Sequence, residues 1–363
     1  MNYKPKAVYI EHGAEQHPFT ERVLEKLPDT PVYHIASSAS VVDEIKKNHT
    51  DVFGAGKKHL VLSRFKGALL KKCPGISPGM VCCNYYIVNL MKNCAYDCSY
   101  CFLQGFLENS PLLEAFVNVE DFLEELDAAF RAHPDRTFRV GTGELADSLA
   151  LDDLLPYSDS LIPFFNERDN AVLELKTKSD QVERLLGQAS CRNVIVSWSL
   201  NPQVVIDREE KGTPSLAARL AAASKCQDKG FRIGLHFDPI ILFPGWEHAY
   251  GGLIRQVFAT LSAEKIEWIS LGSFRYRSNL KKLIRERHEE SGLFAAEHVQ
   301  SRDGKFRYFR PLRNRAYETL RRKIKQHSEE LNVYLCMETK EIWEGVTGKT
   351  PRNDEKLNAF FDL

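Results

Sequence analysis

Short apolar stretches alternate with helical patterns through the middle of this chain, and this alternation limits the possible folds more than any other feature. The apolar stretches are Tyr85–Leu90, Phe138–Gly141, Ala171–Leu175, Val194–Ser199, Phe231–Phe237 and Ile266–Leu271. Helical spacing of apolar residues separates them at Val119–Ala132, Ser215–Lys229 and Glu247–Ser262. Strands that alternate with helices predict a parallel sheet. The functional groups of such folds lie at the carboxyl ends of the strands.

The first 80 residues have the pattern of a separate small α/β unit. Strand candidates at Ala7–Ile10 and His59–Ser63 flank helix candidates at Phe19–Leu27 and Val41–Lys47. A connection rich in glycine and proline follows at Cys73–Gly79. We therefore expect a small N-terminal α/β domain, a barrel-type domain and a C-terminal basic extension, over residues 1–80, 81–275 and 276–363.

The C-terminal third predicts a strand and a hairpin. Val333–Met337 is apolar enough for a strand, and Asp303 and Gly304 indicate a hairpin turn within Ser301–Arg310.

Charge is unevenly distributed along the chain, although the chain as a whole is neutral. Residues 275–325 contain 16 Lys and Arg against 6 Asp and Glu, whereas residues 108–159 contain 13 acidic and 3 basic residues. The basic region is suited to phosphate groups, and solvated helix faces are the alternative explanation.

Composition limits the class of protein. The residues are 43% hydrophobic and 27% charged, which is ordinary for a globular chain with a sizeable core. No run of about 18 apolar residues occurs, so we expect no membrane segment. Nine cysteines in a chain of this length suggest metal or redox chemistry rather than a disulfide scaffold. We expect a cytoplasmic protein, since such chemistry needs a reducing compartment.

Three cysteines in eight residues, Cys94, Cys98 and Cys101, form the most informative motif. A structural zinc site needs four ligands, so three thiolates do not complete one. Three thiolates do suit a [4Fe-4S] cluster that leaves one iron open to another ligand. A zinc loop or buried free thiols are the alternatives.

This spacing, with an aromatic residue before the third cysteine, resembles the signature of the radical S-adenosylmethionine (SAM) superfamily. The resemblance implies a partial (β/α)6 barrel of the TIM type. It also implies SAM on the open iron, reductive cleavage to a 5'-deoxyadenosyl radical, and an external electron donor of the flavodoxin or ferredoxin type. Tyr100 would then pack near the adenine.

Polar residues follow the later strands, where they would converge on SAM. Glu144 ends the second strand within Gly141–Glu144, which resembles the glycine-glycine-glutamate motif that holds the SAM amino group. A carboxylate beside an ammonium is favourable, although Glu144 also suits a helix N-terminus. Lys176 or Lys178 after the third strand is suited to the SAM carboxylate, and a solvated strand end is the alternative. Ser199 and Asn201 follow the fourth strand as candidates for ribose or carboxylate oxygens.

Other candidates lie outside the SAM contacts. His236 and Asp238, two apart on the fifth strand, share a face and are catalytic candidates that bind substrate or move a proton. A purely structural His-Asp pair is the alternative. Cys73, Cys82 and Cys83 precede the cysteine motif; a second metal site and hydrogen donation are possible roles, but we favour buried small side chains.

The order of the motifs resembles the spore photoproduct lyase family of radical SAM proteins. The shared pieces are Val8–Glu11, the cysteine loop with Phe102–Gln104, Thr177–Lys178, Ser199–Asn201, Lys211–Thr213 with Arg219, Asp238–Ile240 and Gly245–Trp246. The resemblance implies light-independent reversal of a thymine dimer in spore DNA and a basic hairpin on DNA, here Arg302–Arg310. It also implies SAM contacts from Tyr100, Lys178 and Ser199.

Two positions depart from that family. The resemblance implies a hydrogen-donating cysteine where this chain has Gly141, and a tyrosine where it has Phe102. We therefore expect a radical SAM enzyme of this family that acts on nucleic acid, with substrate chemistry that differs from the lyase. The alternatives are a radical SAM enzyme for a small molecule or protein, and a zinc-dependent nucleic-acid-binding protein without catalysis.

Overall fold

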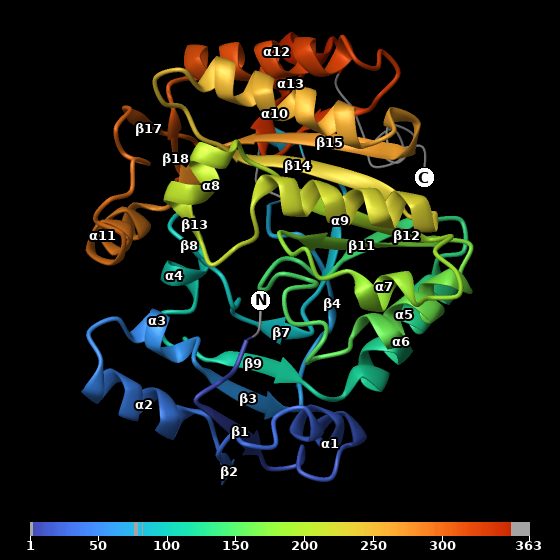
Figure 1. Cartoon of the computed structure of the whole chain (residues 1–363), viewed down its shortest axis with the longest axis vertical. Helices are drawn as coiled ribbons and strands as arrows, with labels where there is room; N and C mark the ends of the chain where they lie inside the picture. Colours follow the sequence, from blue (N-terminus) through green and yellow to red (C-terminus); the bar gives the residue numbers. More distant parts are fainter. Residues whose placement is uncertain (1–2, 76–78, 82, 350–363) are drawn as a thin grey trace.

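A curled sheet of eight strands forms the centre of the computed structural model, which describes residues 3–75, 79–81 and 83–349 (Figure 1). Across the sheet the strands are β19 (Val333–Leu335), β15 (Ile266–Ser273), β14 (Arg232–Ile240), β12 (Val194–Ser199), β11 (Ala171–Thr177), β10 (Phe138–Gly141), β6 (Tyr86–Val88) and β4 (Leu70–Lys72). All neighbours pair in parallel except β4, which pairs antiparallel with β6. The six predicted strands are therefore adjacent and in chain order, which confirms the partial barrel.

Helices pack against this sheet, whose strands are almost wholly buried, although several of the buried side chains are polar, among them Arg139, Glu174 and His236. Every residue of β12 is buried, as expected for a central parallel strand. The covering elements are α5 (Val119–Ala132), α6 (Ser158–Asn166), α7 (Glu183–Leu186), α8 (Gln203–Glu209), α9 (Leu216–Lys229), α10 (Trp246–Thr260) and the 3-10 turn Ala263–Lys265. α9 begins where the Ser215 hydroxyl accepts a hydrogen bond from the Ala218 amide, and it ends at Gly230, whose φ is 108°.

A second, five-stranded sheet lies at the lower end of the molecule in Figure 1. Its order is β2 (Val32–Ile35), β1 (Ala7–Glu11), β3 (His59–Ser63), β9 (Leu113–Phe116) and β7 (Met91–Lys92), accompanied by α1 (Pro18–Glu25), α2 (Ala39–Asn48) and α3 (Val52–Gly56). Two of its strands come from beyond residue 80, so the chain passes back into the small sheet after β6. The expected domain bounds stay a prediction.

The C-terminal part adds a small sheet, a hairpin and helices. The elements are β16 (Arg275–Tyr276), α11 (Ser278–Arg287), β17 (His298–Gln300), β18 (Phe306–Tyr308), α12 (Arg310–Lys325) and α13 (Lys340–Thr347), with β20 (Glu338–Thr339) paired to β5 (Met80–Val81). β17 and β18 form the predicted hairpin, with Gly304 at φ 77° in its turn. Strand β19 confirms the predicted strand near residue 333. No helix of the described residues is long and apolar enough to cross a membrane.

Candidate functional site

The cysteine motif forms a compact loop between the two sheets. Cys94 follows β7, Cys98 lies in the short strand β8 (Asp97–Cys98), and Cys101 precedes α4 (Leu103–Phe106). Asn93 adopts φ 67°, and its side-chain oxygen accepts a hydrogen bond of 2.8 Å from the Cys94 amide. Gln104 donates to the carbonyls of Ser99 and Cys101 at 2.8 and 3.2 Å. Because β7 lies between β6 and the motif, the loop begins from the small sheet rather than directly from the first barrel strand.

The three thiols share apolar surroundings. Cys94 and Cys101 pack against Phe53, Leu103, Leu107 and Leu145, and all three cysteines contact the group formed with Tyr96 and Ala150. Burial, with a smaller contribution from Asp147, raises the pKa of Cys94 to about 11. Burial also raises the pKa of Cys98.

These surroundings fit an iron–sulfur cluster. Buried thiols with raised pKa values become thiolates only when a cationic group binds them, and a [4Fe-4S] cluster is held by such thiolates. Within the described residues, no three His, Cys, Asp or Glu side chains converge as ligands of a single metal ion. Cys94, Cys98 and Cys101 are the residues that would hold the cluster.

A buried carboxylate, Glu210, gathers the predicted SAM residues of the fourth strand and the cysteine loop. It lies in β13 (Glu210–Lys211), which pairs antiparallel with β8, and this pairing places Glu210 opposite Cys98. The Tyr100 hydroxyl donates to one carboxylate oxygen of Glu210, and the Asn201 amide donates to the same oxygen at 2.9 Å. Arg219 pairs with the other oxygen at 2.5 Å. Sequence reasoning missed Glu210, because it follows its partner Tyr100 by 110 residues and no local motif marks it.

Lys178 lies beside this group. Its ammonium is 5.6 Å from the centroid of the Tyr100 ring. Burial lowers the pKa of Lys178, but Cys98 and Glu210 outweigh that effect and the pKa is raised. Ser199 is buried, and its carbonyl accepts a hydrogen bond of 2.9 Å from Arg219. Tyr100, Lys178 and Asn201 are therefore brought together, and Asn201 is also bound by the Tyr250 hydroxyl at 2.8 Å.

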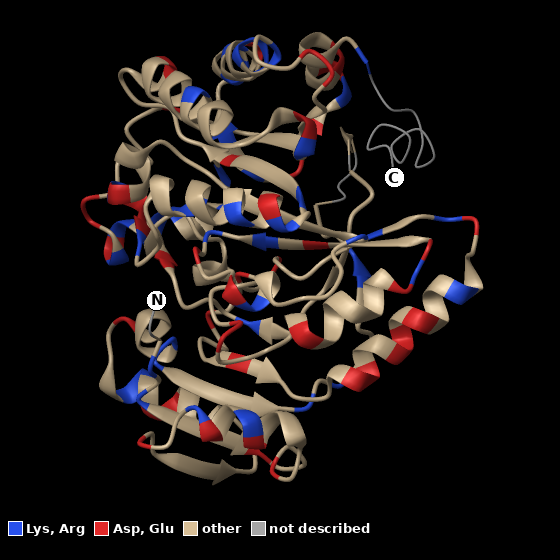
Figure 2. Ribbon diagram, turned by 45° about the vertical axis from the view of Figure 1, so that its right-hand side comes forward, with Lys and Arg blue, Asp and Glu red and all other residues tan. Residues whose placement is uncertain are grey.

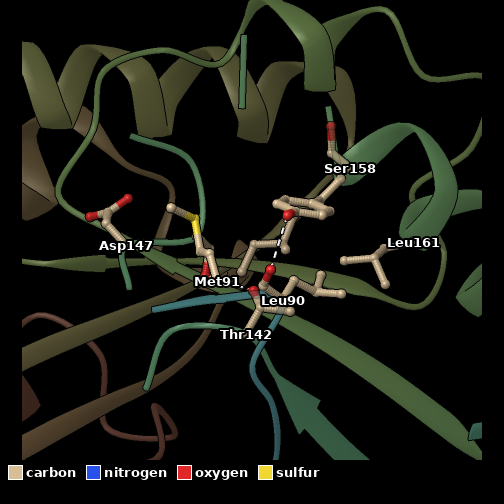
Figure 3. A pocket seen from close by; sticks show the side chains of 9 residues that line it. Leu90, Met91, Thr142, Asp147, Ser158 and Leu161 are labelled. Carbon is tan, nitrogen blue, oxygen red and sulfur yellow. Dashed lines mark hydrogen bonds between the residues drawn. The ribbon is translucent and has the colours of Figure 1, made fainter. Parts of the chain in front are cut away.

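Asp147 joins the loop after the second strand to the end of the third strand. It accepts hydrogen bonds of 2.6 Å from both the Thr177 hydroxyl and the Lys178 amide. Asp147 also lines a small pocket, in which it lies on the opposite side from Leu161 (Figure 3). Tyr157 and Leu90 also line this pocket, and the Tyr157 hydroxyl donates a hydrogen bond of 2.9 Å to the Leu90 carbonyl. Asp147 fixes the backbone that presents Lys178, and sequence reasoning had not identified it.

Glu144 follows β10, near the carboxyl ends of the neighbouring strands β6 and β10. Its carboxylate accepts a hydrogen bond of 2.7 Å from Asn89, and the Asn89 oxygen accepts one of 3.3 Å from the Leu145 amide. Burial raises the pKa of Glu144, and the hydrogen bond from Asn89 opposes this shift. The half-buried carboxylate is therefore available to an ammonium group at the carboxyl end of the second strand.

His236 and Asp238 are each bound to a separate partner inside the barrel. His236 Nε2 lies 2.7 Å from Glu174, and Glu174 pairs with Arg139 at 2.7 Å. Burial lowers the pKa of His236 to about 4, so the ring is neutral near pH 7. Asp238 forms two contacts with Arg275, at 3.0 and 3.1 Å. Their catalytic role stays a prediction.

Other predicted positions have distinct surroundings. Burial raises the pKa of Cys73, and Cys82 lies outside the described residues. Phe102 is 49% exposed, and its ring centroid lies 6.0 Å from that of Phe106, which is 63% exposed.

In the hairpin, the side chains of Arg307 and Asp303 are only 1% and 2% exposed, and they form an ion pair of 2.6 Å. Arg302 and Arg310 remain exposed.

Comparison with known proteins shows which family the sequence matches. The model of the family described as spore photoproduct lyase matches residues 3–335. Spore photoproduct lyase of Bacillus subtilis is 25% identical over 295 residues, 80% of this chain and 84% of that protein. The Geobacillus protein of the same name is 25% identical over 300 residues, with the same coverage of 80% and 84%.

The fold is also found in solved structures. A structure of spore photoproduct lyase complexed with dinucleoside spore photoproduct superposes with a TM-score of 0.82 at 24% identity, covering 92% of this chain and 100% of that chain. A double variant of the lyase with bound AdoMet and dinucleoside spore photoproduct gives a TM-score of 0.81 at 23% identity, covering 92% and 99%. These results confirm the family expected from the motifs. The chain belongs to the spore photoproduct lyase family of radical SAM enzymes, whose cofactors are a [4Fe-4S] cluster and SAM.

Proposed function

We propose that this chain cleaves SAM reductively and directs the resulting radical to a lesion in DNA. The observation that carries the proposal is the gathering of Lys178 and Tyr100 beside the three-cysteine loop. When bound, the [4Fe-4S] cluster and SAM supply a 5'-deoxyadenosyl radical. Lys178 is suited to the SAM carboxylate, Glu144 to its ammonium, and the Tyr100 ring to its adenine.

The apolar wall around the cysteines supports radical chemistry. Phe53, Leu103, Leu107 and Leu145 pack against Cys94 and Cys101 and make one side of the loop apolar. Charged contacts are stronger where water is excluded, so the interactions of Lys178 and Glu144 would gain strength in this setting. Ser199 and Asn201 are the remaining candidate contacts, and Glu210 fixes the orientation of Asn201.

A DNA lesion is supported by charge and by family. Arg302 is exposed in the hairpin turn, Arg310 is exposed at the start of α12, and α12 presents further Lys and Arg (Figure 2). The acidic residues gather instead on α5, at the lower right of the same view. The related lyase was solved with a dinucleoside spore photoproduct, a DNA lesion of the kind proposed here.

The proposal also includes an electron donor and a location. We infer that an external flavodoxin or ferredoxin reduces the cluster, and that the exposed Phe102 and Phe106 beside Cys101 are suited to contact it. An oxygen-sensitive cluster needs a reducing compartment, which supports a cytoplasmic location.

The test begins with anaerobic reconstitution and measurement of iron and of 5'-deoxyadenosine formed with dithionite and SAM. We expect about four irons per chain and SAM cleavage. The second measurement is repair of dinucleoside spore photoproduct, with binding of UV-irradiated duplex DNA at several salt concentrations. SAM cleavage without DNA binding at low salt would contradict the DNA substrate and favour a small molecule or protein. Bound zinc without SAM cleavage would contradict the whole proposal.

A further inference from the structure

The hydroxyl of Tyr85 occupies the space that a side chain at Gly141 would need. A Cβ atom built on Gly141 would lie 1.4 Å from the Tyr85 hydroxyl oxygen and 2.2 Å from its Cζ. Gly141 is the last residue of β10, and Tyr85 directly precedes β6, the neighbouring strand. The phenol therefore fills the carboxyl end of the second strand, and any side chain at Gly141 would have to displace it.

Tyr85 lies among the polar groups of the barrel interior. Its ring centroid is 5.0 Å from the guanidinium carbon of Arg139. Arg139 also forms an ion pair with Glu174. Burial raises the pKa of Tyr85 well above its usual range, and Glu174 raises it further. The phenol is therefore protonated at every physiological pH, and it keeps a hydrogen that it can give.

The residue as a whole is half-buried, and among the described residues no hydrogen bond to or from the Tyr85 hydroxyl is found. Cys336, another group with a transferable hydrogen, instead contacts Arg275 at 3.6 Å from its sulfur. Tyr85 thus presents a phenolic O–H group beside Gly141, at the carboxyl end of the second strand.

We propose that Tyr85 is a catalytic hydrogen-atom donor to the substrate radical, replacing a donor at position 141. The inference rests on the proposed function. In the step, the phenolic O–H bond breaks homolytically, a C–H bond forms on the substrate carbon, and Tyr85 becomes a neutral tyrosyl radical. One electron from the external donor and one proton from water return it to the phenol.

Deuterium incorporation tests this step. In D₂O the phenol hydroxyl exchanges, so the product formed from dinucleoside spore photoproduct should carry deuterium. Tyr85→Phe keeps the ring but has no hydroxyl, and we expect at least a tenfold lower yield of repaired product per SAM cleaved, with loss of the deuterium. Tyr33→Phe, an exposed tyrosine in β2, is the control and should behave as the unaltered chain.

A second measurement tests the geometry without cofactor or substrate. Gly141→Ala should lower the thermal unfolding midpoint by several degrees, because its methyl group meets the Tyr85 hydroxyl. Combined with Tyr85→Ala, the same change should be nearly neutral, since the effects of contacting residues are not additive. In this vacated space, Gly141→Cys with Tyr85→Ala should recover part of the hydrogen return.

The outcomes separate the two proposals. Equal yield and equal deuterium content in Tyr85→Phe and the unaltered chain would overturn the role of Tyr85 alone. If the effects of Gly141→Ala and Tyr85→Ala on the unfolding midpoint were additive, the Tyr85 hydroxyl would not fill the space beside Gly141, and that geometry would be contradicted. Failure of the unaltered chain to cleave SAM, or to turn over the lesion while it cleaves SAM, would overturn the proposed function and this inference with it.

Discussion

The Lys178 ammonium lies 5.6 Å from the centroid of the Tyr100 ring, and both side chains are next to Glu210. A cation and an aromatic face in one small volume are suited to a ligand with a carboxylate and a flat base. The pairing of β8 with β13 places Glu210 opposite Cys98, and both of these residues raise the pKa of Lys178, which follows β11.

Replacement of Lys178 should weaken SAM binding. Lys178→Met keeps much of the side-chain volume but removes the charge, and we expect a dissociation constant ~10- to 100-fold higher, as for loss of a charged hydrogen bond. Calorimetry on the reconstituted protein would measure it. Lys282→Met is the matched control, because Lys282 is 81% exposed. An equal weakening in both variants, or unchanged affinity in Lys178→Met, would contradict the assigned contact.

Each cluster cysteine should be required for iron. Cys94→Ser, Cys98→Ser and Cys101→Ser should each reduce iron well below the ~4 atoms per chain of one [4Fe-4S] cluster and abolish SAM cleavage. Cys191→Ser, which lies near Lys229 on another part of the barrel, should retain both. Full iron content in a cluster variant, measured by metal analysis and absorbance, would show that the ligands were assigned wrongly.

Removal of Glu174 should destabilise the fold strongly. Glu174→Ala leaves the buried Arg139 without its carboxylate, which costs ~3–5 kcal/mol in unfolding free energy. Asp169→Ala breaks an exposed pair with Arg192 and should cost ~0–1 kcal/mol. Chemical denaturation of the two variants would compare these costs, and similar values would mean that the Arg139–Glu174 pair adds little.

Stability should fall in mild acid because of His236. Burial lowers the pKa of His236 to about 4, below the usual 6.5, so the unfolded chain takes up this proton first as pH falls. The folded state should therefore lose stability between pH 6.5 and pH 4, with no contribution from this ring above pH 6.5. His236→Gln should reduce that loss by an amount on the order of 3 kcal/mol. Parallel acid slopes in the two proteins would contradict the shift.

DNA binding should depend on two exposed arginines, Arg302 in the hairpin turn and Arg310 at the start of α12. Arg302→Ala and Arg310→Ala should each weaken binding of duplex DNA and reduce the slope of log affinity against log salt by ~0.9 for each phosphate that is no longer neutralised. Arg307→Ala should act differently, because Arg307 is buried with Asp303 and its removal would destabilise the hairpin. Fluorescence anisotropy at several salt concentrations would measure the slopes. Unchanged slopes in both surface variants would place the DNA elsewhere.

The sequence predicted the strand order because apolar runs and helical spacing report burial directly. β10, β12 and β3 begin and end at the predicted residues. The cysteine loop was also predictable, since its ligands lie within eight residues. The sequence did not identify Glu210, Asp147 or Tyr85 as site residues. Their partners are distant in sequence, and no local motif marks a single acidic residue or tyrosine. Only the pairing of strands shows that the Tyr85 hydroxyl fills the space beside Gly141.

The small sheet also has a role in protecting the metal site. Phe53 of α3 packs against Cys94 and Cys101, and Lys57, the residue after that helix, pairs with Asp97 at 3.2 Å. β7, which leads into Cys94, is a strand of the same sheet. A chain shortened to begin after residue 80 would therefore retain all three cysteines but lack one wall of their chamber. We therefore expect a cluster held by such a fragment to be lost faster in air than one held by the whole chain.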